Sequence, residues 1–181
     1  AVTVGTAIWR DRSGKPRGTS AELDLAELVR EPRLELKRGF SLVAHDIDPA
    51  KAALWRTRGA TMVDSAESVA ASVERTICMV ETTAQAEAVI AGEHGIARSA
   101  RPGHIVVCMS TIDPFAARRL AGQLAPRGIA MLDAPVSGGT GRAASGELSI
   151  IVGGALETVA ACKDLFEAMG KNVFHVGGLG Q

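Results

Sequence analysis

Residues 40–59 read FSLVAHDIDPAKAALWRTRG, and this stretch contains the repeating unit from which the fold can be predicted. Its first part, FSLVAHD, is a short apolar run that is typical of a strand. Asp48 and Pro49 then mark a helix start, because aspartate caps the first turn and proline suits the first helical position. Gly59 ends the predicted helix. A strand followed directly by a capped helix is the unit of an α/β protein.

The same alternation continues along the rest of the chain. Further strands are predicted at 60–63, 75–80, 104–109, 129–132, 148–154 and 172–176, and further helices at 64–73, 82–92, 113–128 and 155–170. Strands that are apolar on both faces and alternate with helices indicate a doubly wound, mainly parallel sheet covered on each side. We expect residues 1–181 to form a single domain, with ligands bound at the carboxyl ends of the strands.

An aspartate closes the strand in the opening stretch, and it is the first candidate for a ligand contact. In a dinucleotide-binding sheet, an acid at the position of Asp46 accepts hydrogen bonds from the ribose of the adenosine half. Its alternative role is helix N-cap, which Asp48 already fills. Because a carboxylate repels a 2′-phosphate, NAD is favoured over NADP, with His45 nearby to soften that preference.

A second candidate is the glycine-rich stretch LDAPVSGGTGRAASGELSIIVGG, residues 132–154. Its glycines lie close to the spacing of a dinucleotide fingerprint, but that fingerprint opens a helix. The residues ELSIIVGG that follow are rich in β-branched side chains and predict a strand. Backbone N–H groups and the hydroxyls of Ser137, Thr140 and Ser145 suit an anion, and a carboxylate is as good a candidate as a phosphate.

The composition argues against several classes of partner. The chain holds 20 Lys and Arg and 20 Asp and Glu, so its zero net charge does not attract nucleic acid or an anionic membrane. No membrane-length apolar stretch and no signal peptide is recognised, so a cytoplasmic location is expected. Cys78, Cys108 and Cys162 show no metal or redox spacing, and the first two are predicted to be buried thiols. The four histidines show no ligand spacing either, so no metal site is expected.

Three motifs resemble those of the β-hydroxyacid dehydrogenases, the family of 3-hydroxyisobutyrate dehydrogenase. DAPVSGG at 133–139 resembles the family's substrate loop, STIDP at 110–114 its nicotinamide-side motif, and AHDIDPAK at 44–51 its second strand and following helix. The likeness covers residues 39–180 and implies a Rossmann-like dinucleotide-binding domain. In the family, a helical domain follows and builds much of the dimer, so a homo-oligomer is expected only together with that domain.

The resemblance also implies roles for individual residues. Ser137, Gly138 and Gly139 would hold the carboxylate of a small hydroxy acid through a hydroxyl group and backbone N–H groups. The cofactor would contact Asp46, Val80, Glu81, Gln85 and Thr111. Among these, Thr111 would meet the nicotinamide ribose, although the residue pattern by itself allows Ser110 or Thr111 to be a simple helix cap.

The N-terminal segment, residues 1–38, departs from the family pattern. A strand is predicted within AVTVGTAI and a helix at 20–31, but Gly5, Gly14 and Gly18 lack the spacing of the fingerprint. A basic loop occupies its place, and its charges suit either solvent or a pyrophosphate; they belong to Arg10, Arg12, Lys15 and Arg17. The fingerprint is therefore missing, and we expect weak cofactor binding.

Two further departures from the family concern the turn at Val80-Glu81, which would lie along the cofactor, and the catalytic lysine. Val80-Glu81 stands where the family usually has Leu-Pro, which brings a carboxylate near the cofactor. The family's catalytic lysine lies on a helix after VGGLGQ, beyond Gln181. No catalytic residue is therefore assigned here, since Lys163 and Lys171 lie in or after the wrong helix.

The sequence thus predicts the NAD- or NADP-binding domain of an oxidoreductase that transfers a hydride between a nicotinamide cofactor and a small 3-hydroxy acid. For residues 1–181 alone we expect no turnover, because a positioned base is required to remove the hydroxyl proton. Two alternatives stay open. One is a non-catalytic nucleotide-binding module, favoured by the departures, and the other is an imine reductase-like enzyme, disfavoured by the carboxylate loop.

Overall fold

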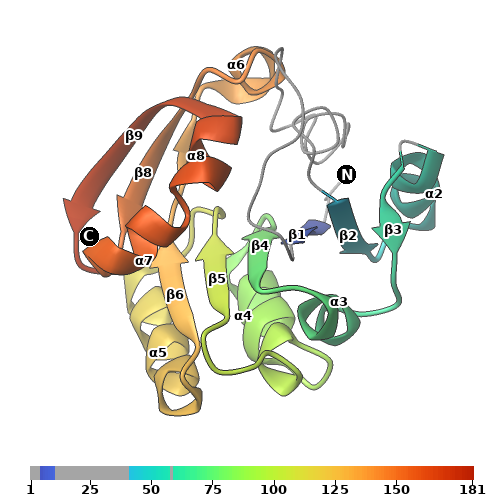
Figure 1. Ribbon diagram of the computed structural model, residues 1–181, viewed down its shortest axis with the longest axis horizontal. Coiled ribbons are helices and arrows are strands. Elements are labelled where there is room, and N and C mark those ends of the chain that lie inside the picture. The colour runs from blue at the N-terminus through green and yellow to red at the C-terminus, as the bar shows by residue number, and fades with distance from the viewer. Residues whose placement is uncertain (1–4, 11–40, 58) are drawn as a thin grey trace.

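The computed structural model describes residues 5–10, 41–57 and 59–181 (Figure 1). The helix predicted at 20–31 and the rest of the N-terminal segment, apart from Gly5–Arg10, lie outside these ranges. The strands are β1 Gly5–Arg10, β2 Ser41–Asp46, β3 Thr61–Met62, β4 Arg75–Met79, β5 Ile105–Cys108, β6 Ala130–Asp133, β7 Val136–Ser137, β8 Leu148–Gly153 and β9 Gly170–Gly177. The helices are α2 Pro49–Thr57, α3 Ala66–Ser72, α4 Thr83–Ala91, α5 Pro114–Leu124, α6 Gly139–Ala144, α7 Leu156–Ala161 and α8 Lys163–Met169, with 3₁₀ turns η1 Ile96–Arg98 and η2 Ala125–Arg127.

Short polar side chains start the helices, as the sequence indicates. Asp48 accepts a hydrogen bond of 2.9 Å from the N–H of Ala50 at the start of α2. Asp113 does the same for Ala116 at the start of α5. Ser65 caps the start of α3, where its side chain accepts from the N–H of Ser68. The first turn of each of these helices therefore follows closely on the carboxyl end of a strand.

The strands form one nine-stranded sheet within the described residues, in the order β3-β2-β1-β4-β5-β6-β8-β7, with β9 paired to β8. The strands from β2 to β7 share one direction, whereas β1, β8 and β9 run against them. The α/β class is confirmed, but the sheet is partly mixed rather than mainly parallel throughout. Hydrophobic pattern predicts that a segment is a strand, but the connections and pairing decide its direction.

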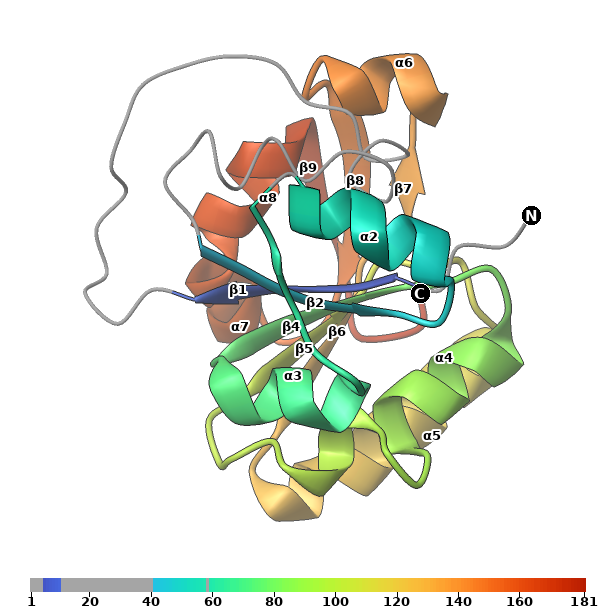
Figure 2. The ribbon, with the colours of Figure 1, turned by 90° about the vertical axis from the view of Figure 1, so that its right-hand side faces the viewer.

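β1 is the reversed strand that matters most for a ligand site. It lies between β2 and β4 and is antiparallel to both, which Figure 2 shows as arrows of opposite sense for β1 and β2. Gly5 pairs with Asp46 and Met79, so the beginning of β1, not its end, lies at the carboxyl edge of the parallel strands. β1 therefore does not lead into a phosphate-binding turn at that edge.

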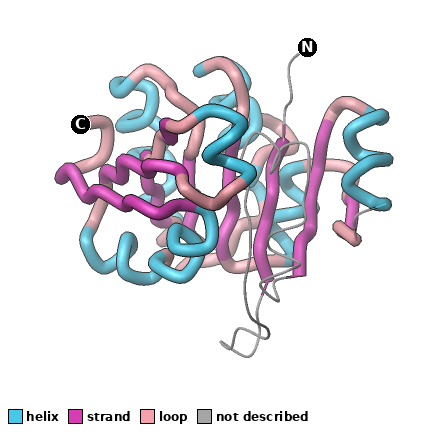
Figure 3. Tube along the Cα trace, turned by 90° about the horizontal axis from the view of Figure 1, so that it is seen from above, coloured by secondary structure: helices cyan, strands magenta, loops and turns pink. Residues whose placement is uncertain are grey.

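Helices cover both faces of the sheet, as predicted for a doubly wound fold. In Figure 2, α3, α4 and α5 lie on one side of the strands and α2 on the other, and Figure 3 shows the strands as a band with helices on either side. One core cluster joins α3, α4 and α5 to β4 and β5. A second cluster on the opposite face joins α8, including Phe166, to residues of β5, β6 and β8. These two clusters bury most of the apolar core, and two smaller clusters lie around β2.

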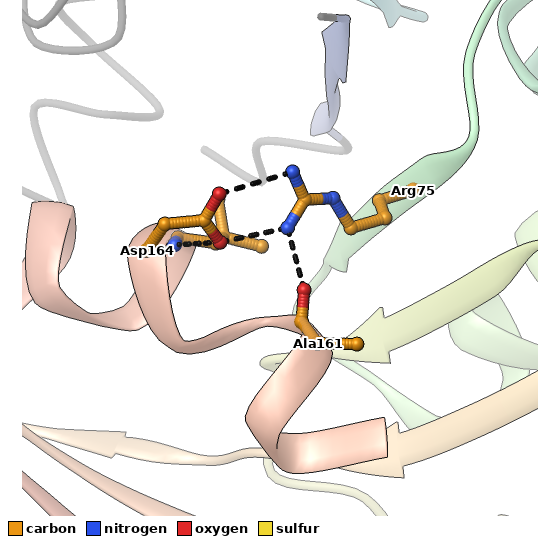
Figure 4. A network of polar contacts seen from close by, with 4 residues as sticks. Arg75, Ala161 and Asp164 are labelled. Carbon is orange, nitrogen blue, oxygen red and sulfur yellow. Dashed lines mark hydrogen bonds and ion pairs between the residues drawn. The ribbon is translucent and has the colours of Figure 1, made fainter. Parts of the chain in front are cut away.

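A single helix was predicted over 155–170, and the structure breaks it in two at Cys162. The Arg75 guanidinium donates to the Ala161 carbonyl at 2.8 Å and to both carboxylate oxygens of Asp164 at 2.7 and 3.2 Å (Figure 4). In a continuous helix the Ala161 carbonyl would accept from the N–H of Leu165. That N–H instead donates to Asp164 Oδ1. The Ala161 carbonyl therefore accepts its hydrogen bond from Arg75 on β4 in place of the helix N–H.

The glycine-rich stretch also differs from the prediction, because it contains the short helix α6 before the strand β8. The stretch was expected to pass into a strand without a helix. Arg142 and Ala143 favour helix, and Ala143 is buried in the same core cluster as Leu148. Tertiary packing therefore stabilises a six-residue helix in a stretch whose glycines disfavour helix.

None of the helices in the ranges that the structure describes combines the length and apolar character needed to cross a membrane.

Candidate functional site

The carboxyl ends of four strands line up along one edge of the sheet. Register pairs Asp46 and Met79 with the same residue of β1, and pairs Cys108 with both Cys78 and Asp133. The segments that follow these strands therefore lie side by side. This is the edge at which open α/β sheets bind their ligands.

Asp46 is the most unusual side chain on this edge. It is 8% exposed, and its Oδ1 accepts a hydrogen bond of 2.9 Å from the N–H of Asp48. Its Oδ2 is buried and has no hydrogen-bond partner within the described residues. Burial raises the pKa of Asp46, against the lowering effects of the Asp48 N–H and of Lys51. A buried carboxylate oxygen without a donor costs free energy, and a ligand hydroxyl would supply that donor.

A pocket of about 400 Å³ opens next to this carboxyl group. Its lining combines apolar, acidic and basic side chains from β2, α2 and the segment after β3: His45, Asp46, Ile47, Pro49, Ala52, Arg56, Met62, Val63 and Asp64. Ile47 is 68% exposed, which is unusual for an isoleucine. The His45 ring lies 3.1 Å from the Val63 carbonyl, which fixes one wall of the pocket. An apolar surface beside a hydrogen-bonding acid suits a nucleoside.

The next three predicted residues lie in the turn after β4 and in the first turn of α4, and hydrogen bonds hold this segment rigid. The N–H of Val80 donates to Ser110 Oγ at 2.6 Å. Gln85 Oε1 accepts from the N–H groups of Glu81 and Thr82 at 3.0 Å each. Gln85 thus completes a capping box with Thr82. The spacing of Thr82 and Gln85 is that of a capping box, a signal that can be recognised in the sequence.

Ser110 and Thr111 follow β5 and differ in exposure. Ser110 is buried and accepts the Val80 bond, whereas Thr111 is exposed. Neither caps the next helix, because Asp113 fills that position. Asp113 also donates its N–H to Thr83 Oγ1 at 3.1 Å, which ties the loop after β5 to the start of α4.

The glycine-rich stretch places Ser137 on β7, which continues in the direction of β6 beyond its carboxyl end. Ser137, Gly138 and Gly139 are all exposed. Gly138 and Gly139 have φ values of +143° and +64°, and a Cβ at Gly138 would lie 2.9 Å from the Cβ of Arg142. Bare backbone beside an exposed arginine is a reasonable environment for a carboxylate.

Sequence reasoning missed two residues near this edge, Asp133 and Arg118. Asp133 ends β6, is buried, and forms a hydrogen bond with the backbone of Gly180; burial raises its pKa. Arg118 on α5 donates to the carbonyls of Leu179 and Gly180. Asp133 ends a buried strand just as Asp46 does, a signal that was available in the sequence. The arginine gave no comparable signal, because its partners are distant backbone atoms.

Other reactive side chains do not join the site. The prediction that Cys78 and Cys108 are buried is confirmed, and Cys162 is buried as well. Hydrogen bonding with Cys108 and burial raise the pKa of Cys78, and burial raises that of Cys162 to about 11, so these thiols stay protonated at neutral pH. Lys163 and Lys171 are exposed and paired with Glu167 and Glu147.

Comparison with known proteins now identifies the family. Residues 33–177 match the model of the NAD binding domain of 6-phosphogluconate dehydrogenase. The chain belongs to this family of NAD-binding domains.

Two curated relatives illustrate the match. The mitochondrial 3-hydroxyisobutyrate dehydrogenase of Mus musculus is 35% identical over 145 residues, which are 80% of this chain and 43% of that protein. The NAD-dependent L-serine dehydrogenase of Pseudomonas aeruginosa is 38% identical over 148 residues, or 81% and 50% of the two chains. The chain therefore spans about half the length of the curated relatives that it matches.

Solved structures agree with this assignment. The 3-hydroxyisobutyrate dehydrogenase of Salmonella typhimurium superposes with a TM-score of 0.68 at 31% identity, covering 75% of this chain and 47% of that one. The imine reductase of Myxococcus stipitatus in complex with NADP⁺ superposes with a TM-score of 0.75 over 87% of this chain and 53% of its own, at 17% identity. The second likeness concerns the fold alone.

Proposed function

We propose that this chain binds NAD along the carboxyl edge of its sheet, as the dinucleotide-binding part of a dehydrogenase of small 3-hydroxy acids. The observation that carries the proposal is the buried Oδ2 of Asp46, which lacks a hydrogen-bond donor beside a pocket large enough for a nucleoside. The adenosine ribose would supply the missing donor. The negative charge of Asp46 opposes a 2′-phosphate, so NAD is preferred, while Arg56 and His45 in the same lining moderate that preference.

The other predicted residues lie along the same edge of the sheet, and the proposal gives each of them a role. Val80, Glu81 and Gln85 shape the rigid turn along the adenosine half, and Thr111 contacts the ribose of the nicotinamide half. Ser137, Gly138 and Gly139 hold the carboxylate of the substrate with a hydroxyl and backbone N–H groups. A bound nicotinamide would supply hydride-transfer chemistry, and the residues of this chain would orient it and the substrate.

Substitution of Asp46 tests the cofactor role. In Asp46→Asn, Oδ1 can still accept the Asp48 N–H, but the charge is gone. We expect NADH to bind about 10- to 100-fold more weakly, which is the value of a charge-assisted hydrogen bond, and the discrimination against NADPH to shrink. The free energy of unfolding should stay the same or rise, because the buried charge is removed.

Fluorescence titration with NADH and NADPH measures both effects, and chemical denaturation measures stability. Asp64→Asn is the matched control, because Asp64 lines the same pocket and carries no assigned role. A wild-type chain that prefers NADPH, or an Asp46→Asn variant with unchanged NADH affinity, would refute the ribose contact.

One observation favours a second candidate function, a nucleotide-binding module without catalysis. The reversed β1 leads into no phosphate-binding turn at the carboxyl edge, so within the described residues this strand supplies no glycine-rich cradle for a pyrophosphate. Because no turnover is expected of residues 1–181 alone, the assay of NADH formation with a panel of 3-hydroxy acids is run on this chain and on a longer protein, if the gene encodes one. Turnover by the longer protein favours the dehydrogenase, and NADH binding without turnover in either favours the module.

A further inference from the structure

The last turn of the described chain, Gly177–Gly180, is held by contacts from three sides. The carbonyl of Gly177 accepts the N–H of Gly154 at 2.9 Å, which joins the turn to the end of β8. Arg118 Nε lies 3.2 Å from the Leu179 carbonyl, and its Nη2 lies 2.9 Å from that of Gly180, which joins the turn to α5. From β6, the buried Asp133 forms a hydrogen bond with the Gly180 backbone.

Packing leaves this turn little room to shift. Gly180 is buried at φ +74°, and a Cβ there would lie 2.8 Å from the carbonyl oxygen of Pro114. A Cβ at Gly153 would lie 2.7 Å from the carbonyl oxygen of Gly178. Leu179 packs against the core cluster that includes Cys108 and Leu120. The backbone of the turn therefore lies directly against Pro114, the first residue of α5.

Pro114 directly follows the loop that carries Thr111. The same loop is fixed on its other side by bonds from the β4–α4 turn, through Ser110 to Val80 and through Asp113 to Thr83. The Gly177–Gly180 turn thus forms one wall of the segment Ser110–Pro114, and the β4–α4 turn forms the opposite wall. If one wall is loosened, the segment can shift, which matters for a contact that tolerates little displacement.

We propose that Arg118 and Asp133 are positioning residues, which press the Gly177–Gly180 turn against Pro114 and so fix Ser110–Pro114 in the shape that receives the nicotinamide half of the dinucleotide. The inference rests on the proposed function and adds two residues to it. Arg118 acts through its fork of N–H donors, which a lysine does not reproduce. Asp133 acts as a hydrogen-bond acceptor, a role that asparagine can retain.

The test compares a ligand that spans both halves, NADH, with ADP, which occupies only the adenosine half. In Arg118→Ala and in Asp133→Ala, we expect NADH affinity to fall about 5- to 20-fold, the effect of one or two hydrogen bonds, and ADP affinity to stay within about twofold. Asp133→Asn should restore most of the NADH affinity, whereas Arg118→Lys should not. Calorimetric titration of the full 181-residue chain gives both affinities.

Arg119→Ala is the matched control, because Arg119 is the next residue on α5, is exposed, and pairs with Glu87. It should leave both affinities unchanged. Amide hydrogen exchange provides a readout that needs no ligand: exchange should accelerate in 110–114 and 177–180 of the Arg118→Ala and Asp133→Ala variants, but not in Arg119→Ala.

The possible outcomes separate the two claims. An equal loss of NADH and ADP affinity indicates general damage and overturns the positioning role, as does faster exchange confined to 177–180. A wild-type chain that binds neither ligand overturns the proposed function, and exchange in 110–114 then still decides whether Arg118 and Asp133 fix that segment.

Discussion

At the scale of single residues, the sheet buries a histidine in its neutral form. His104 is 3% exposed, and its Nε2 lies 2.5 Å from Thr76 Oγ1. Burial lowers the pKa of His104 from the ordinary 6.5 to about 4, although a hydrogen bond with the Val73 backbone acts in the opposite direction. Between these two pKa values, His104 is therefore protonated in the unfolded chain and neutral in the folded protein.

This difference predicts a pH dependence of stability. Below about pH 6.5 the unfolded state becomes protonated at His104 while the folded state does not, so the free energy of unfolding falls until about pH 4. The contribution between pH 7 and pH 5 is on the order of 2 kcal/mol. Denaturant unfolding of wild type and His104→Gln across this range measures it. The slope should be clearly smaller in the variant, and equal slopes would assign the pH dependence to other groups.

At the scale of elements, one arginine joins the sheet to the helix pair α7 and α8. The side chain of Arg75 is 19% exposed and that of Asp164 54% exposed, so the pair is only partly shielded from solvent. The pair contributes to stability through its geometry, because the planar guanidinium donates to the Ala161 carbonyl and to both carboxylate oxygens of Asp164 at once (Figure 4).

Replacement of this arginine should therefore destabilise the helix pair. We expect Arg75→Met, which keeps the apolar stem, to lower the free energy of unfolding by about 1–3 kcal/mol, because the Ala161 carbonyl loses its donor. Lys163→Met is the control, since it removes an exposed ion pair on the same helix and should change stability by less than about 0.5 kcal/mol. Chemical denaturation compares the two, and equal effects would show that the guanidinium does not hold the helix break.

At the scale of the whole molecule, β1 holds the sheet together. It pairs with β2 on one side and with β4 on the other, and no direct pairing joins those two strands within the described residues. The half of the site around Asp46 is therefore connected to the half around Thr111 through the backbone of β1.

Proline in the middle of β1 tests this arrangement. Strands flank β1 on both sides, so the N–H of residue 8 faces either β2 or β4. Ile8→Pro therefore removes a ladder hydrogen bond and should lower the free energy of unfolding by more than about 2 kcal/mol. Ile8→Val keeps the backbone N–H and should behave nearly like wild type. Denaturant unfolding is the measurement. A proline variant as stable as the valine variant would mean that β1 is not a central strand.

Much of the fold and part of the site were predictable from local sequence. Apolar runs and the Asp48-Pro49 and Asp113-Pro114 starts predict the alternation of strands and helices, since both depend on neighbouring residues. The alternation in turn predicts that Asp46 and Thr111 lie at one edge, because parallel strands end on the same side. The Ser137–Gly139 motif was identified by its resemblance to a family, and its role remains a prediction.

Tertiary structure decided the features that depend on residues far apart in the chain. The direction of β1 follows from its two partners, and the break at Cys162 follows from an arginine on β4 that lies 86 residues from Ala161. The Gly180 carbonyl likewise accepts a hydrogen bond from Arg118, which lies 62 residues earlier in the chain. No local pattern contains these contacts, because a backbone carbonyl is the same at every position. Only the folded chain determines which distant donor reaches it.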